Sequence, residues 1–302
     1  MDQSISVAQF QEKLLELAQP LAPLDLPLLD AHGATLSSNL MVDDQLLLKA
    51  GDRIGSTQIG LAASLGLDRL PCRPHPRVVI ISAGDDLVEP GSKLADDDEF
   101  ESNSWFLTTF VREIGAHAFR VHTIAQNEEV LKLIVEDQLV RADLIVISGE
   151  SKDESFELIN SVLSSLGEIT TVLPNLAESG KHSFGSIGPD KTPVIALPGE
   201  PLANFLSAEL FIRPMILKML GYRGIYRNSK KIKLDFEVSG VDGQANYLRG
   251  KIGSEKQIAL LPDQGAISTI SAADCLIYLS EKTTKIDKGE SVEVIFLQGD
   301  LV

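Results

Sequence analysis

Hydrophobic positions follow three different spacings along the 302 residues of the chain. One clear helical stripe runs from Val7 to Leu17, and short extended pieces follow it. Between residues 72 and 222, short apolar runs alternate with stretches in which apolar residues recur every three or four positions, as on one face of a helix. From residue 223 onward apolar residues recur at every second position, which is typical of strands with one buried face. The pattern therefore predicts three parts.

The middle part has the pattern of an α/β domain. Its apolar runs predict strands at residues 77–84, 117–124, 143–149 and 193–199. Its helical stripes predict helices at residues 101–115, 127–142, 156–166 and 200–221, with Ser102, Asn103 and Asn127 as candidate N-caps and Gly115 as a C-terminal stop. Because fully apolar strands alternate with helices, we expect a mainly parallel sheet that is covered by helices on both faces.

These patterns divide the chain into residues 1–70, 71–222 and 223–302. The first is a mixed segment in which Ser56 or Thr57 would cap a helix that ends at Gly66, and it has too little apolar sequence to hold a core alone. The second is a three-layer α/β/α domain. The third is a small all-β domain of short strands between Gly, Asp and Asn turns.

Composition and charge exclude several classes of protein. Apolar residues make up 44% and charged residues 23%, as in ordinary soluble globular proteins. A net charge of −16 disfavours binding to nucleic acid, which needs concentrated Lys and Arg. Cys72 and Cys275 have no His-Cys cluster beside them, so neither a zinc site nor a disulfide framework is predicted. No apolar run is long enough to insert in a membrane, and the acidic N-terminus is not a signal peptide, so a cytoplasmic protein is expected.

Several short strings resemble those of one known family, in the same order along the chain. They are "IGLAASLGL" at residues 59–67, "SAGDDLVEPG" at 82–91, "FESNSWFL" at 100–107, "ALPGEPLA" at 196–203, and "GAISTISAADCLIYL" with "KGESVEVIFL" in the last domain. Through these strings the chain resembles MoeA and gephyrin, proteins that insert molybdate into molybdopterin. The resemblance implies a molybdopterin-binding-like α/β domain, a role in molybdenum-cofactor biosynthesis, and Mg²⁺ and molybdopterin as ligands.

The resemblance also implies which residues line the site: Asp85, Asp86, Ser102, Asn103, Gly149, Gly180, Lys181, Pro198 and Gly199. The two aspartates would also hold Mg²⁺, because they follow a strand at the edge where open parallel sheets bind ligands. Structural roles compete with most of these assignments. They are an Asx-turn for the aspartates, N-caps for Ser102 and Asn103, a rigid turn for Pro198 and Gly199, a solvated side chain for Lys181, and an ordinary loop position for His182.

The chain departs from the family in several places, among them Glu200, which stands where the family's proline-glycine loop has asparagine. No D-G-Y-A string occurs, so the family's inserted β domain is expected to be absent. The family's S-G-G-V-S-V-G-D-Y-D turn is also replaced, since Glu150 and Glu154 stand where it has glycines and Ser155 stands where it has its catalytic aspartate. Four acids and one lysine between residues 150 and 157 would repel an anionic ligand. The sequence thus predicts that this turn no longer holds molybdopterin. We therefore expect that the purified protein does not bind molybdopterin with useful affinity and that molybdate insertion is impaired.

A second hypothesis follows from an eroded site in an intact fold. The chain would then be a non-catalytic, gephyrin-like scaffold that binds a peptide segment of a partner, such as a cell-division protein or a membrane-protein tail. The resemblance places that peptide in the cleft between the α/β domain and the C-terminal β domain. It also implies a homodimer, which the thin N-terminal segment would help to form.

Overall fold

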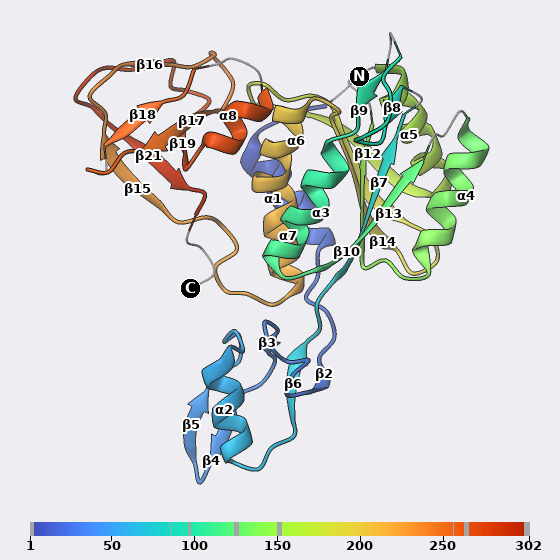
Figure 1. Cartoon of the computed structure of the whole chain (residues 1–302), viewed down its shortest axis with the longest axis vertical. Coiled ribbons are helices and arrows are strands. Elements are labelled where there is room, and N and C mark those ends of the chain that lie inside the picture. Colours follow the sequence, from blue (N-terminus) through green and yellow to red (C-terminus); the bar gives the residue numbers. More distant parts are fainter. Residues whose placement is uncertain are drawn as a thin grey trace.

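The computed structural model describes residues 3–84, 86–95, 98–123, 127–149, 153–255, 257–262 and 266–298. Its centre is a seven-stranded sheet in the order β1-β12-β13-β14-β11-β7-β10 (Figure 1). Strands β14, β11, β7 and β10 are parallel neighbours and β1 is parallel to β12, so the predicted mainly parallel sheet is confirmed. The bounds are β1 (Gln3–Ile5), β7 (Arg77–Ala83), β10 (His117–Thr123), β11 (Leu144–Ser148), β12 (Gly167–Pro174), β13 (His182–Ile187) and β14 (Thr192–Leu197).

Strands β12 and β13 form an antiparallel hairpin that the sequence pattern did not reveal. The side chains of β12 are mostly exposed or half-buried, and β13 is built from His, Ser and Gly beside two apolar residues. Neither strand has the continuous run of apolar residues from which the parallel strands were predicted. The hairpin inserts two antiparallel pairings between β1 and the parallel block.

Helices cover both faces of the sheet, as predicted. One face carries α1 (Val7–Leu17), α3 (Asn103–Ile114), α6 (Pro201–Ser207), the π-helical turn η1 (Ala208–Ile212) and α7 (Arg213–Met219), and the other carries α4 (Glu128–Leu139) and α5 (Asp153–Leu166). Because side chains alternate along a strand, Val78 and Ile80 enter the first core while Val79 and Ile81 enter the second. Asn127 caps α4 by accepting the Val130 backbone N–H, and Gly115 ends α3 with φ of 104°.

Helix α1 packs with the α/β domain rather than with the rest of the N-terminal segment. Phe10 is fully buried, and its ring centroid lies 4.6 Å from that of Phe211 and 5.2 Å from that of Phe184. Strand β1 extends the central sheet beside β12. The segment predicted as residues 1–70 is therefore divided between two structural units.

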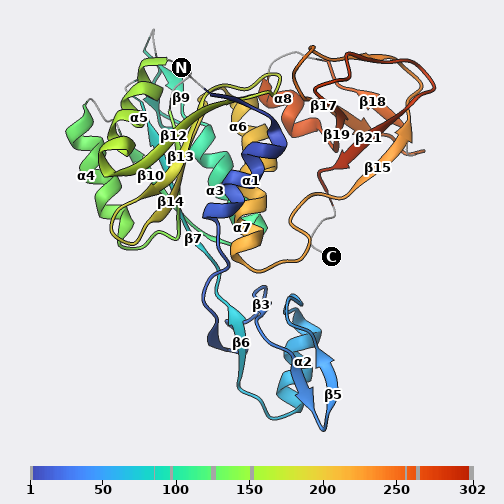
Figure 2. The same ribbon diagram turned by 180° about the vertical axis from the view of Figure 1, so that it is seen from behind.

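Residues 24–73 form a small unit that projects from the α/β domain (Figures 1 and 2). It contains β2 (Leu24–Pro27), β3 (Thr35–Leu36), β4 (Leu40–Val42), β5 (Gln45–Leu48), α2 (Ser56–Ser64) and β6 (Arg69–Arg73) around a small apolar core. The N-cap of α2 is Gly55, so the predicted cap by Ser56 or Thr57 was wrong by one residue, while Gly66 follows the helix with φ of 76°. His75 connects the units, because its ring nitrogens lie 2.5 Å from Gly115 O and 3.3 Å from His32 O.

The C-terminal β domain has a five-stranded antiparallel sheet in the order β15-β21-β19-β17-β18 and a separate pair, β16 and β20. Its bounds are β15 (Ser229–Lys233), β16 (Val238–Ser239), β17 (Asn246–Ile252), β18 (Ile258–Leu260), α8 (Ala266–Ala272), β19 (Cys275–Leu279), β20 (Lys285–Ile286) and β21 (Ser291–Phe296). The predicted β domain is confirmed, with the short helix α8 in addition. Over the residues described, no helix is both long and apolar enough to span a bilayer.

Candidate functional site

The carboxyl ends of β7 and β11 place two serines side by side. Ser82 and Ser148 are paired in register, and both are about 1% exposed. Their side chains follow the alternation of Val78 and Ile80, so they lie on the face covered by α3 and α6. The edge at which ligands bind to open parallel sheets therefore carries two hydroxyl groups beneath the starts of these helices.

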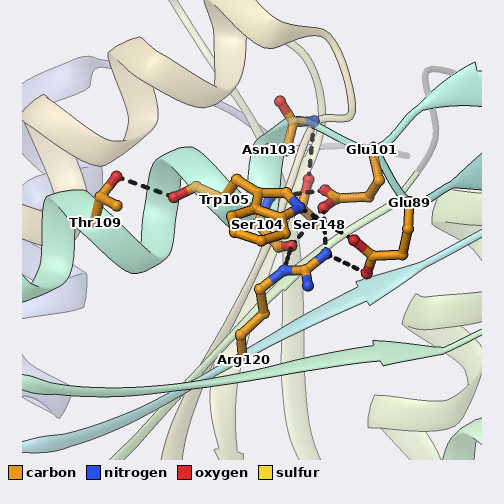
Figure 3. A network of polar contacts seen from close by, with 8 residues as sticks. All are labelled: Glu89, Glu101, Asn103, Ser104, Trp105, Thr109, Arg120 and Ser148. Carbon is orange, nitrogen blue, oxygen red and sulfur yellow. Dashed lines mark hydrogen bonds and ion pairs between the residues drawn. The ribbon is translucent and has the colours of Figure 1, made fainter. Parts of the chain in front are cut away.

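Two amide side chains meet at the same point. Asn103, the first residue of α3, donates through Nδ2 to the Gly199 carbonyl at 2.6 Å and to Ser148 Oγ at 3.3 Å. Asn204, in α6, donates through Nδ2 to Ser148 Oγ at 2.9 Å. Figure 3 shows Asn103 directed toward Ser148. Ser82, Ser148, Asn103 and Asn204 form what is called the polar cluster below. Through its hydrogen bonds this cluster joins β11, α3, α6 and the turn at Gly199.

The competing interpretation of Ser102 and Asn103 as N-caps is confirmed in position for Ser102 and was wrong for Asn103, which is the first residue of α3. Ser102 occupies the N-cap position of α3, but its side chain makes no capping hydrogen bond. The Glu101 carboxylate accepts the Ser104 backbone N–H at 2.7 Å instead, which leaves the Asn103 amide available to the site. The sequence did not single out Glu101, because acids are common before helices and its burial was not apparent.

Some polar atoms near the cluster have no hydrogen-bond partner within the described part of the chain. They are Ser82 Oγ, Asn204 Oδ1 and, in the loop after β12, Ser179 Oγ. Buried polar groups in native proteins are nearly always hydrogen-bonded. A hydroxyl and an amide oxygen left in this state at a strand edge suit a bound molecule that offers both donors and acceptors.

The loop from Gly180 to His182 closes one side of the edge. A Cβ added to Gly180 would lie 3.1 Å from Pro198 Cβ, so the glycine permits close packing of two loops that the resemblance assigned to the site. Lys181 Nζ lies 3.5 Å from Glu157 Oε1. These contacts bring Gly180, Pro198 and the start of α5 together.

His182 is not the loop histidine that the sequence suggested. It begins β13, is fully buried, and its Nδ1 lies 2.9 Å from Gly180 O and its Nε2 2.7 Å from Ser207 Oγ. Burial lowers its pKa to about 4, so the ring is neutral at pH 7. Since the Gly180 carbonyl can only accept, Nδ1 carries the proton of the neutral ring. No signal in the sequence separates this histidine from an exposed one.

The acidic turn is only partly visible. Glu150, Lys152 and the side chain of Asp153 lie outside the described residues, as does Asp85. Glu154 and Glu157 are exposed on the first turn of α5, and Ser155 is half-buried beside Gly149. A Cβ at Gly149 would lie 3.0 Å from Ile159 Cδ1, which explains this glycine by packing. Glu200, where the family has Asn, is exposed before α6.

Possible Mg²⁺ ligands are few in the part of the chain that is described. Asp86 is half-buried immediately before β8 (Leu87–Val88), and its backbone carbonyl accepts the N–H of Glu99 in β9 (Glu99–Phe100) at 2.8 Å. Among these residues no group of three His, Cys, Asp or Glu side chains gathers to hold a metal.

Comparison with known proteins places the chain in a family. Residues 79–218 match the model of a probable molybdopterin binding domain, and residues 231–297 match that of the MoeA C-terminal region. Molybdopterin molybdenumtransferase 1 of Mycobacterium tuberculosis is 31% identical over 260 residues, which span 83% of this chain and 61% of that protein. The chain belongs to the MoeA family.

Other members of the MoeA family are more distant in sequence. Gephyrin of Dictyostelium discoideum is 26% identical over 83% of this chain and 40% of its own length. Two MoeA structures from Pyrococcus horikoshii superimpose with TM-scores of 0.83 and 0.79, cover 98% and 97% of this chain, and are 18% and 13% identical. The MoeA-like fold predicted from the motifs is confirmed. The chain spans about three fifths of the length of the mycobacterial relatives.

Proposed function

We propose that this MoeA-family chain acts in molybdenum-cofactor biosynthesis and binds molybdopterin at the carboxyl edge of its α/β sheet. The observation that carries the proposal is the buried polar cluster of Ser82, Ser148, Asn103 and Asn204, in which Ser82 Oγ and Asn204 Oδ1 have no partner among the described residues. It lies within the segment that matches the molybdopterin-binding family model. The acidic turn alone argues against binding, but of this cluster the family motifs pointed only to Asn103.

The chemistry of the cluster suits a pterin. A pterin ring offers amide and amino groups, which donate and accept hydrogen bonds along one edge. Hydroxyl and amide side chains can do both, and they carry no charge that would have to be desolvated. The phosphate of molybdopterin would lie toward Lys181 and the backbone of Gly180, which together supply a cation and close backbone approach.

Mg²⁺ would be held by Asp86 together with oxygen atoms of the phosphate. Such sites use one or two carboxylates and complete the coordination with substrate phosphates and water, so the half-buried Asp86 fits as a protein ligand. Bound there, the ion would neutralise charge on the phosphate. Asp85 is the second candidate by sequence and lies outside the described residues.

Molybdate insertion into adenylylated molybdopterin places a further demand on the site. In the family turn an aspartate stands where this chain has Ser155, and a hydroxyl group brings no negative charge and weaker metal affinity than a carboxylate. The chain's own groups therefore account for binding and orientation of the pterin, while the carboxylate function at that position is lost. We propose that binding is retained and that insertion by this chain alone is slow.

Isothermal titration calorimetry with molybdopterin and its adenylylated form, with Mg²⁺ present, tests the proposal. A complete family member serves as the positive control. Saturable binding supports the proposal. If the control releases heat and this chain does not, the proposed function is wrong and the scaffold hypothesis takes its place.

A second candidate function rests on a cavity between the two larger domains. This cavity of about 240 Å³ lies between α1, η1 and the C-terminal sheet. Its lining combines aromatic and apolar residues (Tyr226, Tyr247, Tyr278, Leu276 and Ile295) with charged ones (Glu209, Arg227 and Glu293), and the ring centroids of Tyr247 and Tyr278 are 5.0 Å apart. Such a pocket suits one apolar anchor of a bound peptide, as expected of a gephyrin-like scaffold.

Selection from a displayed peptide library tests this second candidate. Peptides enriched on the wild-type chain should share an apolar or aromatic anchor, and they should lose binding to Tyr278→Ala. Enriched peptides that bind the variant equally well would contradict it. Sedimentation equilibrium of the same preparation tests the proposed homodimer, because a second copy would double the mass of 32.7 kDa.

A further inference from the structure

The Arg120 guanidinium joins two separate parts of the candidate site. Its Nη2 donates to Glu89 Oε1 at 2.6 Å and to Glu101 Oε2 at 3.0 Å, and its Nε donates to Ser104 Oγ at 2.6 Å. Glu89 lies three residues after Asp86 and directly follows β8, and the segment from Asp86 to Glu89 is called the Asp86 loop below. Glu101 and Ser104 flank Asn103 at the start of α3. One cation thus ties the loop of Asp86 to the helix that carries Asn103 (Figure 3).

Trp105 completes the connection. Its ring centroid lies 4.4 Å from Arg120 Cζ, and its Nε1 lies 3.3 Å from Glu89 Oε2. Glu89 therefore uses one oxygen for Arg120 and the other for Trp105. The tryptophan is the only one in the chain, so its fluorescence reports on this network alone.

The two carboxylates differ in what they do for the fold. The side chain of Glu101 is 1% exposed and also accepts the Ser104 backbone N–H, so its loss would disturb the start of α3. The side chain of Glu89 is 36% exposed and contacts the network from the loop. Glu89 is therefore the connection that can be cut while α3 and its buried ion pair stay in place.

We propose that Glu89, acting through Arg120 and Trp105, is a positioning residue that holds the Asp86 loop over the molybdopterin site. This inference rests on the proposed function. A carboxylate beside a site for an anionic phosphate would by itself weaken binding by repulsion. The contacts of Glu89 imply the opposite net effect, because they fix the loop before the ligand arrives and so reduce the ordering cost of binding.

The direction in which Glu89→Gln changes the affinity for molybdopterin distinguishes a positioning role of Glu89 from a simple effect of its charge. Glu89→Gln removes one negative charge and two charge-assisted contacts. If charge alone matters, the variant binds molybdopterin more tightly than wild type; if positioning matters, it binds about tenfold more weakly, roughly the effect of losing one such hydrogen bond. Glu99→Gln is the matched control, since Glu99 is an exposed acid in β9, the strand that pairs with β8, and this variant should bind equally well or slightly more tightly.

The measurement is a titration of molybdopterin with Mg²⁺, followed by calorimetry and by Trp105 fluorescence. We expect Glu89→Gln to melt within about 2 °C of wild type, which corresponds to a minor surface change. We also expect weaker binding and altered Trp105 emission before ligand is added. Equal or tighter binding by Glu89→Gln, with wild type binding, overturns the inference alone. Absence of binding by wild type overturns the proposed function and the inference with it.

Discussion

Asn103 and Gly199 are 96 positions apart in the sequence, and the Asn103 side-chain amide donates to the Gly199 carbonyl at 2.6 Å. The same Nδ2 lies 3.3 Å from Ser148 Oγ, so one side chain connects the start of α3 to the ends of β11 and β14. The resemblance implied both residues as parts of the site, and the structure brings them together. This contact closes the carboxyl edge between two helices.

Asn103→Ala should weaken both the edge and ligand binding. Loss of the amide leaves the Gly199 carbonyl without this donor, which we expect to lower the free energy of unfolding by about 1 to 2 kcal/mol. Molybdopterin affinity should fall about tenfold or more, because the amide also orders Ser148. Urea unfolding and calorimetry measure the two effects. Ser102→Ala is the control, since its side chain makes no capping bond, and equal effects of both variants would contradict a special role for Asn103.

The sequence predicted the parts of the fold that depend on repeated patterns. Strands such as β7 and β11 are buried on both faces, so their apolar runs are continuous and easily found. Hairpin β12/β13 was missed because its strands have polar or exposed positions. Helix α1 was predicted, but its packing on the central sheet was not. An amphipathic stripe shows that one face of a helix is buried, but it does not show which element that face packs against.

The candidate site was predictable only as far as the family motifs reach. Asn103, Gly180, Pro198 and Gly199 are brought together by contacts between distant segments. The cluster at Ser82 and Asn204 was missed, because a serine at a strand end or an asparagine in a helix carries no signal of burial. The network of Glu89, Glu101 and Arg120 was missed for the same reason, since pairing of charges far apart in sequence depends on the fold.

Phe10→Ala should show that helix α1 belongs to the α/β domain. The Phe10 ring is fully buried against Phe184, Phe211 and His182, so its removal leaves a cavity and should cost about 3 to 5 kcal/mol of unfolding free energy. Chemical denaturation followed by circular dichroism measures this. Leu29→Ala, at a side chain 85% exposed, should change stability by less than about 0.5 kcal/mol. If the two variants are equally stable, the packing of α1 on the sheet is wrong.

Glu209→Gln should loosen the attachment of the C-terminal domain. Glu209, in η1, is 7% exposed and accepts two hydrogen bonds of 2.9 Å from Arg227, in the segment that leads to β15. Gln keeps an acceptor oxygen but no charge, so the two hydrogen bonds from Arg227 become weaker, and we expect the free energy of unfolding to fall by about 2 kcal/mol. Limited proteolysis between residues 222 and 229 should also become faster. Glu237→Gln is the control, because Glu237 pairs with Lys285 at the surface, and no measurable change is expected there.

His182 should make the protein less stable in mild acid. Burial lowers its pKa from 6.5 to about 4, so between these values the unfolded chain binds a proton that the folded chain excludes. Neutral His182 therefore contributes its full stabilisation above about pH 6.5. This stabilisation is lost progressively as the pH falls toward 4, and the total loss of unfolding free energy is about 3 kcal/mol.

We expect the unfolding free energy of wild type to fall across this window more steeply than that of His182→Gln, whose side chain does not titrate. Denaturant unfolding at several pH values between 4 and 7 measures both slopes, and the difference between them removes the contributions of other groups. Parallel slopes would mean that His182 is protonated in the folded protein, and the hydrogen bonds assigned to Gly180 and Ser207 would then need an imidazolium at the centre of the core.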